Sequence, residues 1–136
     1  MILENKIALV TGAANGIGAA SSLTCTKAGA CVICVDIDVE GAQRAAEKLR
    51  KLGLRSMSLQ ADCSQVCDIE DMLDTVIDTQ GRLDIILNNA GINRQADIMD
   101  ITEDEWDRIH QINAKGVFFC LQGAARRMFF KGEERS

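Results

Sequence analysis

The sequence predicts an α/β protein built on a doubly wound parallel sheet. Short, nearly continuous apolar runs alternate along the chain with amphipathic helical patterns. Continuous apolar runs are typical of strands buried on both faces of a parallel sheet. The helical patterns between them are long enough for the right-handed crossovers that join parallel strands. The 136 residues are therefore expected to form one domain, 1–136, large enough to bury a core.

Four strands and the helices between them can be placed from these patterns. Residues 7–10 (IALV), 31–35 (CVICV) and 84–88 (DIILN) are apolar runs, and 56–61 (SMSLQA) alternates, as suits a strand nearer a sheet edge. Apolar stripes at helical spacing predict helices over 39–52 and 66–80, each followed by a glycine that ends it. A further helix is expected between the first two strands, opened by residues 11–18.

The last helix has the clearest start signal. Thr102 is placed to cap it, and Glu105, three residues later, completes a capping box. Ile101 and Trp106 are spaced as a hydrophobic staple, and the acidic residues 103–105 suit the positive end of the helix dipole. These signals predict a structural helix start, followed by one continuous helix over residues 102–128.

Composition argues against several classes of partner. The net charge is −5, and the largest basic cluster is the pair Arg126 and Arg127, so neither nucleic acid nor an anionic membrane surface is an expected partner. No apolar run approaches the ~18 residues that span a bilayer. Glu4 and Lys6 interrupt the N-terminus too early for a signal peptide. We therefore expect a cytoplasmic protein with reduced thiols.

The six cysteines are expected to be small buried residues rather than a disulfide set or a metal site. Cys31 and Cys34 have the spacing of a redox or metal motif, but they lie within a predicted strand. Residues three apart on a strand point to opposite faces, so these two thiols cannot share an ion. No metal site is predicted.

The glycine-rich segment TGAANGIG, residues 11–18, lies between the first strand and the helix that follows it. That context favours a dinucleotide-binding loop over a plain turn. Gly12 permits the sharp turn, Gly16 lets a pyrophosphate approach the main chain, and Gly18 lets the helix pack closely. Free amides and the helix dipole would then face the phosphates. Asn15 and Ile17 of the same loop are counted among the cofactor-binding residues.

The residue that ends the second strand points to the identity of the dinucleotide. Asp36 lies 18 residues after Gly18, near the expected separation, and its carboxylate can accept both hydroxyls of the adenosine ribose. The same carboxylate would repel a 2′-phosphate. Ile37, rather than an arginine or lysine, follows it. Asp36 and Ile37 therefore predict a preference for NAD over NADP.

With these residues the chain resembles the N-terminal portion of the short-chain dehydrogenase/reductase family, in its compact single-domain form. TGAANGIG fits the family's T-G-x-x-x-G-x-G motif, and three further matches follow in order along essentially the whole chain. By this resemblance Asp62 and Cys63 lie along the adenine ring. The residues Asn89, Ala90 and Gly91 of NNAG approach the cofactor ribose, and Asn113 joins the catalytic set.

The resemblance implies a Rossmann-type sheet of strand order 3-2-1-4, truncated before the fifth strand. It implies an oxidoreductase that transfers a hydride between a nicotinamide and a small-molecule alcohol or ketone. The loop INRQAD after NNAG often borders the substrate in this family, so Arg94 and Gln95 either meet a polar substrate or are simply solvated. Sugar, polyol, steroid and acyl-thioester substrates all remain open.

The chain departs from the family pattern in its catalytic residues. The family uses a serine after a fifth strand and a Tyr-x-x-x-Lys pair, but this chain has no tyrosine and ends where the fifth strand should begin. This leaves three hypotheses: the N-terminal part of an NAD-dependent enzyme, a module that binds NAD without turnover, or an interaction fragment. For the last, an exposed fourth strand would pair with another chain, and Val117, Phe118 and Phe119 would be exposed for self-association.

Overall fold

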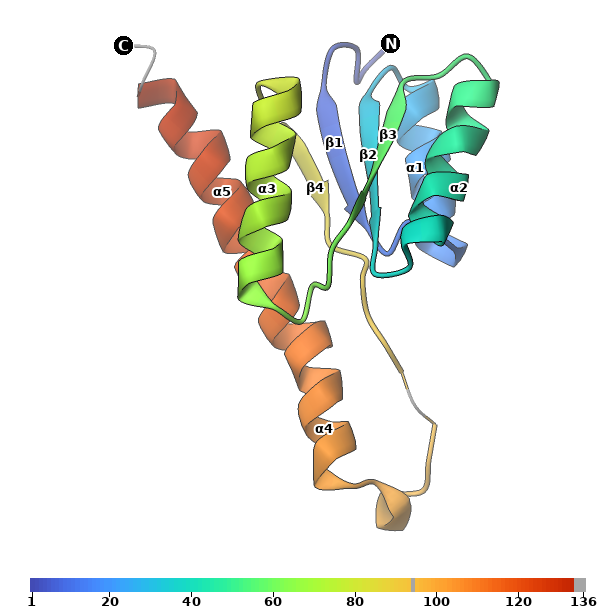
Figure 1. Ribbon diagram of the computed structural model, residues 1–136, viewed down its shortest axis with the longest axis vertical. Coiled ribbons are helices and arrows are strands. Elements are labelled where there is room, and N and C mark those ends of the chain that lie inside the picture. The colour runs from blue at the N-terminus through green and yellow to red at the C-terminus, as the bar shows by residue number, and fades with distance from the viewer. Residues whose placement is uncertain (94, 134–136) are drawn as a thin grey trace.

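Four parallel strands form one sheet in the order β3-β2-β1-β4 (Figure 1). This confirms the predicted Rossmann-type order. The computed structural model describes residues 1–93 and 95–133, with side chains as far as residue 129. In chain order the elements are β1 (Ile7–Thr11), α1 (Gly16–Lys27), β2 (Cys31–Asp36), α2 (Val39–Lys51), β3 (Ser56–Gln60), α3 (Val66–Gln80), β4 (Ile85–Leu87), η1 (Ile98–Asp100), α4 (Glu103–His110), η2 (Gln111–Gly116) and α5 (Val117–Glu133).

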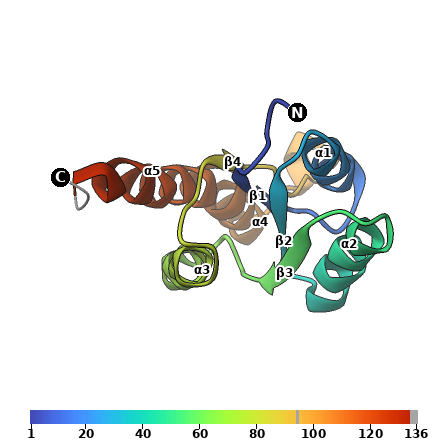
Figure 2. The same cartoon turned by 90° about the horizontal axis from the view of Figure 1, so that it is seen from above.

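Both faces of the sheet are covered by helices. α1 and α2 lie on one face, and α3 and α5 on the other (Figure 2). Successive residues of a strand point to opposite faces, so Ala8 and Val10 belong to the cluster under α1 and α2, whereas Ile7 and Leu9 belong to the cluster under α3 and α5. Burial on both sides explains why the sequence of this strand reads as a continuous apolar run.

The cysteines follow the same alternation. Cys31 packs in the cluster under α3 and α5, and Cys34 in the cluster under α1 and α2, which confirms that the two face opposite sides of the sheet. All six cysteines are free thiols. The expectation that they are all buried is wrong for Cys67, which lies exposed on the first turn of α3, and for Cys25, which is only half-buried.

The two edges of the described sheet are β3 and β4. Met57 and Leu59 of β3 pack against the cluster under α3 and α5, as the alternating pattern predicts for an edge strand. β4 is shorter than the predicted 84–88, covering Ile85–Leu87, and its last residue is exposed.

The last helix corrects a prediction. Thr102 caps α4 through the predicted capping box with Glu105, and the helical segment continues without a break past residue 128 to Glu133, but it is not α-helical throughout. Residues 111–116 form a π-helical turn, η2, between α4 and α5. The turn is tied to distant segments: Gln111 Nε2 donates to the Ser64 carbonyl at 2.9 Å, and Asn113 bonds the backbone of Ile92. Helical periodicity does not encode these contacts.

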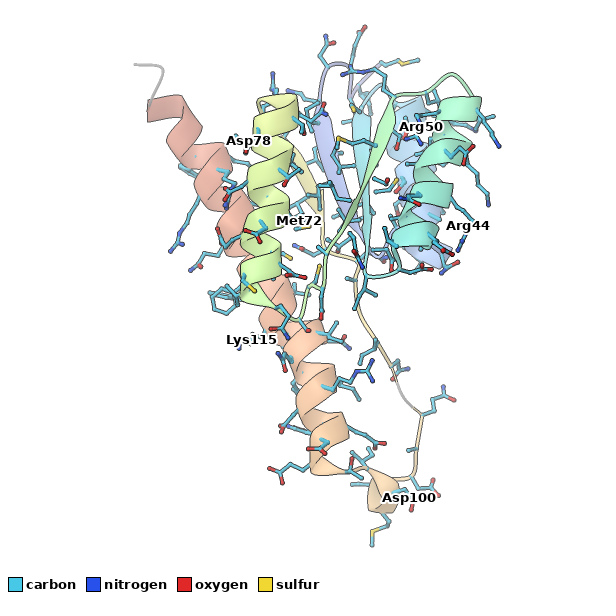
Figure 3. All side chains as sticks on the ribbon, viewed as in Figure 1. Arg44, Arg50, Met72, Asp78, Asp100 and Lys115 are labelled. Carbon is cyan, nitrogen blue, oxygen red and sulfur yellow. The ribbon has the colours of Figure 1, made fainter. Side chains whose placement is uncertain are left out.

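Residues 95–110, which include η1 and α4, project past the carboxyl ends of the strands (Figure 1). Figure 3 shows Asp100, in η1, at the far end of this projection. Ile98, Met99 and Trp106 are exposed on it, and α4 has no buried residue. Among the described helices, none is long and apolar enough to cross a membrane.

Asp84 ties the start of β4 to the start of β1. Its Oδ2 accepts a hydrogen bond from the Ile7 amide at 2.8 Å, and its Oδ1 accepts from Arg82 Nε at 3.0 Å. Burial acts to raise the pKa of Asp84, but the hydrogen bonds from Arg82 and from the Ile7 amide outweigh it, so the pKa lies below its ordinary value.

A lowered pKa in the folded state means that the unfolded state takes up the proton first as pH falls. The stabilisation from Asp84 is therefore complete above its ordinary pKa of 3.8 and is lost as pH falls through the lower folded-state pKa. We expect Asp84→Asn to reduce the free energy of unfolding at neutral pH and to flatten its acid dependence. Urea unfolding from about pH 6 to about pH 2 measures this. Asp78→Asn, at an exposed position of α3 (Figure 3), is the control, and an equal acid slope in both variants would contradict the assignment.

Candidate cofactor-binding site

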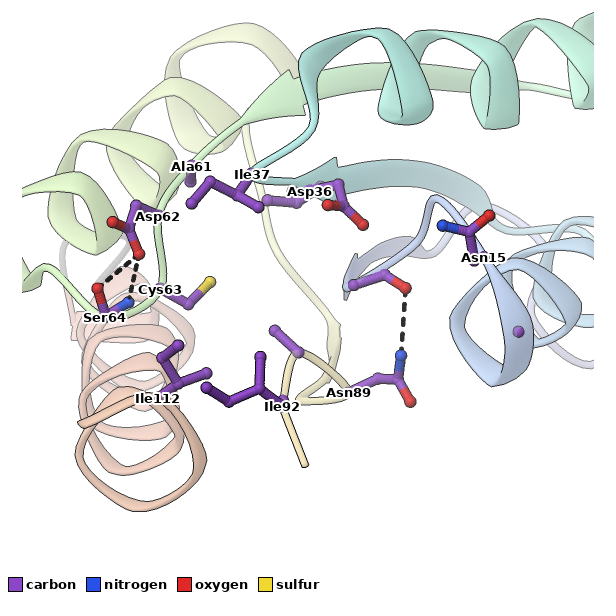
Figure 4. Close-up of a pocket in the computed structure, with 15 residues that line it drawn as sticks. Asn15, Asp36, Ile37, Ala61, Asp62, Cys63, Ser64, Asn89, Ile92 and Ile112 are labelled. Carbon is purple, nitrogen blue, oxygen red and sulfur yellow. Dashed lines mark hydrogen bonds between the residues drawn. The ribbon is translucent and has the colours of Figure 1, made fainter. Parts of the chain in front are cut away.

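A cavity of about 340 Å³ lies at the carboxyl ends of the four strands (Figure 4). It brings together ten of the thirteen site residues that the sequence predicts; Ile17, Gly18 and Asn113 lie outside its lining. Its lining residues are Gly12, Asn15, Gly16, Val35, Asp36, Ile37, Ala61, Asp62, Cys63, Ser64, Asn89, Ala90, Gly91, Ile92 and Ile112. Segments that are far apart in sequence therefore converge on one volume.

The three glycines of the loop differ in what requires them. Gly12 and Gly16 have φ angles of 66° and 56°, in the left-handed region that favours glycine. A Cβ added to Gly16 would meet no protein atom within 4 Å, so this residue borders open space in the cavity. Gly18 lies beneath the loop, where an added Cβ would collide with the Gly12 carbonyl oxygen and lie 2.7 Å from Asn89 Nδ2.

The N-terminus of α1 faces the cavity. Asn15 is the N-cap residue in an extended conformation, and its side chain makes no capping hydrogen bond. The first turn of α1 carries no acidic side chain, so the partial positive charge of the helix end is not neutralised there. Ile17, in the same turn, is exposed and does not line the cavity. This arrangement suits an anionic ligand group.

The Asp36 carboxylate lies at the rim and braces the glycine loop. Its Oδ2 accepts a hydrogen bond from the Ala14 amide at 3.1 Å, and its Oδ1 accepts from the Asp38 amide at 3.1 Å. A carboxylate oxygen has a second lone pair, so both oxygens can accept a further donor from a ligand. Ile37 follows on the cavity wall and is largely exposed.

Asp62 and Cys63 form the wall on the β3 side. Asp62 Oδ1 accepts from Ser64 N at 2.9 Å and from Ser64 Oγ at 2.6 Å, which folds the carboxylate onto its own loop (Figure 4). Cys63 is buried, and a hydrogen bond with Cys120 together with burial raises the pKa of its thiol above the ordinary value. Ser64 also lines the cavity but was not predicted from the sequence, since a serine in a loop carries no distinctive signal.

Thr11 is a second residue that sequence reasoning missed. Its side chain is 1% exposed, and its Oγ1 accepts hydrogen bonds from the amides of Asn89 and Ala90, each at 3.0 Å. Asn89 Nδ2 in turn donates to the Gly12 carbonyl at 3.2 Å. The end of β1 and the segment after β4 are thus held together beneath the cavity. The signal was present, because Thr11 opens the glycine motif.

Asn113 lies in η2, outside the cavity lining. Its Oδ1 accepts from the Ile92 amide at 2.8 Å, and its Nδ2 donates to the Ile92 carbonyl at 2.6 Å. A Cβ on Gly91 would lie 3.2 Å from Asn113 Oδ1. The side chain therefore holds the segment after NNAG against η2. Both polar ends of the Asn113 amide are engaged with backbone.

Two isoleucines form an apolar part of the wall. Ile92 follows Gly91, and Ile112 precedes Asn113, and both line the cavity (Figure 4). Arg94, predicted as a possible substrate contact, lies outside the described residues; Gln95 is exposed. Within residues 1–93 and 95–133, no group of three or more His, Cys, Asp and Glu side chains is arranged to hold a metal ion.

Comparison with known proteins agrees with this geometry. The model of the short chain dehydrogenase family matches residues 6–135. A short-chain dehydrogenase/reductase of Pestalotiopsis microspora is 39% identical over 127 residues, which are 93% of this chain and 48% of the relative. The 2-dehydro-3-deoxy-D-gluconate 5-dehydrogenase of Escherichia coli strain K12 is 36% identical over 130 residues, 96% of this chain and 51% of the relative.

The fold of the chain is also similar to that of a solved structure. A short-chain type dehydrogenase/reductase from Mycobacterium marinum superposes with a TM-score of 0.92 at 34% sequence identity, covering 96% of this chain and 53% of that one. The chain spans about half the length of the relatives that it matches. With a family match over nearly all of its residues, the chain belongs to the short-chain dehydrogenase family.

Proposed function

We propose that this chain binds NAD in the cavity, as the cofactor-binding half of an oxidoreductase that acts on a small-molecule alcohol or ketone. The observation that carries the proposal is that one cavity is lined both by a glycine with open space beside its Cα and by a carboxylate. Gly16 offers main chain without a Cβ at the helix N-terminus, and Asp36 offers an acceptor at the end of the neighbouring strand. These are the two groups that a diphosphate and its adjoining ribose require.

The diphosphate would be held by the first turn of α1. Its amides and the helix dipole favour negative charge, and the site has the room for it beside Gly16. Asp36 would accept the adenosine ribose hydroxyls. It would also repel a 2′-phosphate, and the nearby Arg44 guanidinium is engaged with Asp38 at 3.6 Å and with Glu40 at 3.9 Å. Both features support NAD over NADP.

The remaining wall residues would orient the dinucleotide. Asp62 and Cys63 border the space expected for the adenine ring, and the main chain of residues 89–91 borders the space for the second ribose. When bound, NAD supplies a nicotinamide that accepts a hydride from an alcohol or, reduced, donates one to a ketone. We propose that Asn113 acts as a positioning residue, because its side chain holds Ile92 on the cavity wall.

Turnover is not expected from this chain by itself. Proton exchange with the substrate oxygen in the family depends on a tyrosine beside a lysine, and the chain contains no tyrosine. A positioned general acid–base contributes about 10²–10⁴-fold to rate. We therefore expect calorimetric titration to detect NAD binding and an assay on a panel of alcohols to detect no turnover. A folded chain that ignores NAD, or that prefers NADP, would overturn the proposal.

A glycine pair separates binding from folding. Gly16 and Gly53 both have positive φ angles and both border open space, so replacement by alanine costs each about 1–2 kcal/mol of backbone strain. Of these two glycines, Gly16 lines the cavity and Gly53 does not. We expect Gly16→Ala to weaken NAD binding by at least about tenfold, whereas Gly53→Ala leaves the Kd unchanged. Calorimetry with parallel urea unfolding measures both, and equal Kd values in the two variants would contradict the role of Gly16.

Replacing Asp36 by asparagine tests the specificity. Losing charge-assisted hydrogen bonds to ribose costs about 1.5–3 kcal/mol, so the Kd for NAD should rise by about 10- to 100-fold. The ratio of the NADP and NAD affinities should shift toward NADP, since the repulsion is removed. Glu40→Gln removes an equal charge from a side chain on the exposed face of α2 and is the control. An unchanged ratio in Asp36→Asn would refute the assignment.

A second candidate function is an interaction through β4. The strand is an edge of the described sheet. Phe118 and Leu121 of α5 are exposed, although Val117 and Phe119 are half-buried, contrary to their predicted exposure. An open sheet edge favours pairing of its backbone groups with a strand of another chain. Light scattering over a range of concentrations measures self-association, and a monomer at every concentration would contradict it.

A further inference from the structure

Two cysteines from different elements meet behind the cavity wall. Cys63 lies in the loop between β3 and α3 and lines the cavity, and Cys120 lies on the first turn of α5. Both belong to the buried cluster under α3 and α5. The Cys120 thiol is the main influence that raises the pKa of Cys63, and Cys63 in turn lowers the pKa of Cys120, as expected of neighbouring side chains. The two residues are therefore neighbours in the fold, although they lie 57 positions apart in sequence.

Two contacts hold together the backbones that carry the two thiols. Gly116 lies one helical turn before Cys120, and a Cβ added to it would collide with the Cys63 carbonyl oxygen. In the second contact, Gln111 Nε2 donates to the Ser64 carbonyl at 2.9 Å. These contacts press the loop at 63–64 against the helix. A disulfide needs its two Cα atoms about 4.4–6.8 Å apart, and close backbone packing of this kind is what brings cysteines into that range.

The two thiols differ in access from the cavity. Cys63 is 9% exposed and its sulfur points into the cavity (Figure 4), whereas Cys120 is 2% exposed and lies behind it. Cys31 and Cys34 lie in β2 within the sheet, away from this wall. A small reagent that enters the cavity thus reaches Cys63 first and finds Cys120 next to it.

We propose that Cys63 is an oxidation site for a small peroxide and that Cys120 converts the oxidised residue into a disulfide. In the first step the Cys63 sulfur attacks one peroxide oxygen, the O–O bond breaks, and a sulfenic acid and one water form. In the second step the Cys120 sulfur attacks the Cys63 sulfur, the S–O bond breaks, and a second water leaves. Two thiols and one hydrogen peroxide give one disulfide and two waters, with two electrons passing from sulfur to the peroxide.

The surroundings set the relative rates of the two steps. The hydrogen bond with Cys120 and burial raise the pKa of Cys63, and the negative charges of Asp62 and Asp36 add to the effect, so thiolate is scarce and the first step is slow. The second step is intramolecular between neighbouring side chains, which gives it a high effective concentration. The sulfenic acid should therefore be short-lived while Cys120 is present.

The experiment uses the 136-residue chain with Cys67→Ser, which removes the exposed thiol as a source of intermolecular disulfides. The reduced protein is treated with hydrogen peroxide, blocked, digested and mapped by mass spectrometry. We expect one disulfide that joins the peptides of Cys63 and Cys120. With Cys120→Ala added, we expect Cys63 to be recovered as the adduct of dimedone, a sulfenic acid trap. Circular dichroism checks that each variant is folded. If the alanine variant is not, Cys120→Ser replaces it.

Two results would overturn the proposal. One is recovery of Cys63 as a free thiol under conditions that oxidise the urea-unfolded chain, and the other is a disulfide from Cys63 to Cys31 or Cys34. A further arm rests on the proposed function: NAD in the cavity should slow disulfide formation by at least about tenfold. If calorimetry shows no NAD binding and the disulfide still forms, the proposed function fails and the oxidation site stands. If NAD binds and the rate is unchanged, shielding by the dinucleotide is refuted.

Discussion

Replacing Gly18 by alanine is expected to lower the free energy of unfolding by about 3 kcal/mol, because the new Cβ would overlap the Gly12 carbonyl oxygen. The sign of this effect is decisive. In an unconstrained helix, glycine to alanine stabilises by about 0.8–1 kcal/mol through helix propensity. Here the colliding atom is backbone, which cannot rotate aside, so the glycine loop has to move. Urea unfolding gives the stability, and titration with NAD gives the accompanying loss of affinity.

Gly123→Ala in α5 is the matched control. A Cβ at Gly123 would meet Leu73 Cδ1, Glu70 Oε1 and Arg127 Nη1, all of them ends of side chains that can adjust. Its effect should stay within about 1 kcal/mol, since the gain in helix propensity offsets a small rearrangement. If Gly18→Ala is as stable as the Gly123 variant, close packing of α1 against the loop is not what requires the glycine.

Thr11→Val is expected to cost about 2 kcal/mol of stability, since a valine of similar shape leaves the Ala90 amide without its acceptor. The Asn89 amide retains the Leu87 carbonyl at 3.0 Å, so the loss falls mainly on one donor, the half-buried Ala90 amide. NAD binding should weaken as well, because residues 89–91 line the cavity and lose their tether to β1. Chemical unfolding and calorimetry measure the two effects separately.

Thr11→Ser keeps the hydroxyl and removes only a methyl group, so it separates the hydrogen bonds from packing. We expect the serine variant to retain most of the stability and nearly all of the NAD affinity of the unaltered chain. A serine variant as impaired as the valine variant would show that Thr11 acts through its methyl group. That outcome would remove the proposed link between β1 and the segment after β4.

Prediction from the sequence succeeded where the signal is local. The apolar runs of β1 and β2 indicated strands buried on both faces, and the alternation of Met57 and Leu59 indicated an edge strand. The capping box of Thr102 and Glu105 was likewise readable, because its two members lie within one helical turn. Each of these signals depends on residues within about five positions of each other along the chain.

The candidate site was predicted less evenly. Glycine spacing and the carboxylate at the end of β2 located the loop and Asp36, and ten of the predicted residues line one cavity. Ser64 and Ile112 were not found, since neither residue type is unusual in a loop or a helix. The roles of Thr11 and Asn113 depend on partners 78 and 21 residues away, respectively.

Pattern along the chain was thus sufficient for the strands, the helix starts and the glycine turn after β1, because backbone sterics and side-chain periodicity act between near neighbours. The parallel order of the sheet brings residues 11, 36, 63 and 89 to one edge. Only that arrangement creates the cavity, the π-helical turn of residues 111–116 and the proximity of Cys63 to Cys120. These features arise from contacts across the fold, where the energy of a hydrogen bond or a steric exclusion depends on which distant segment is adjacent.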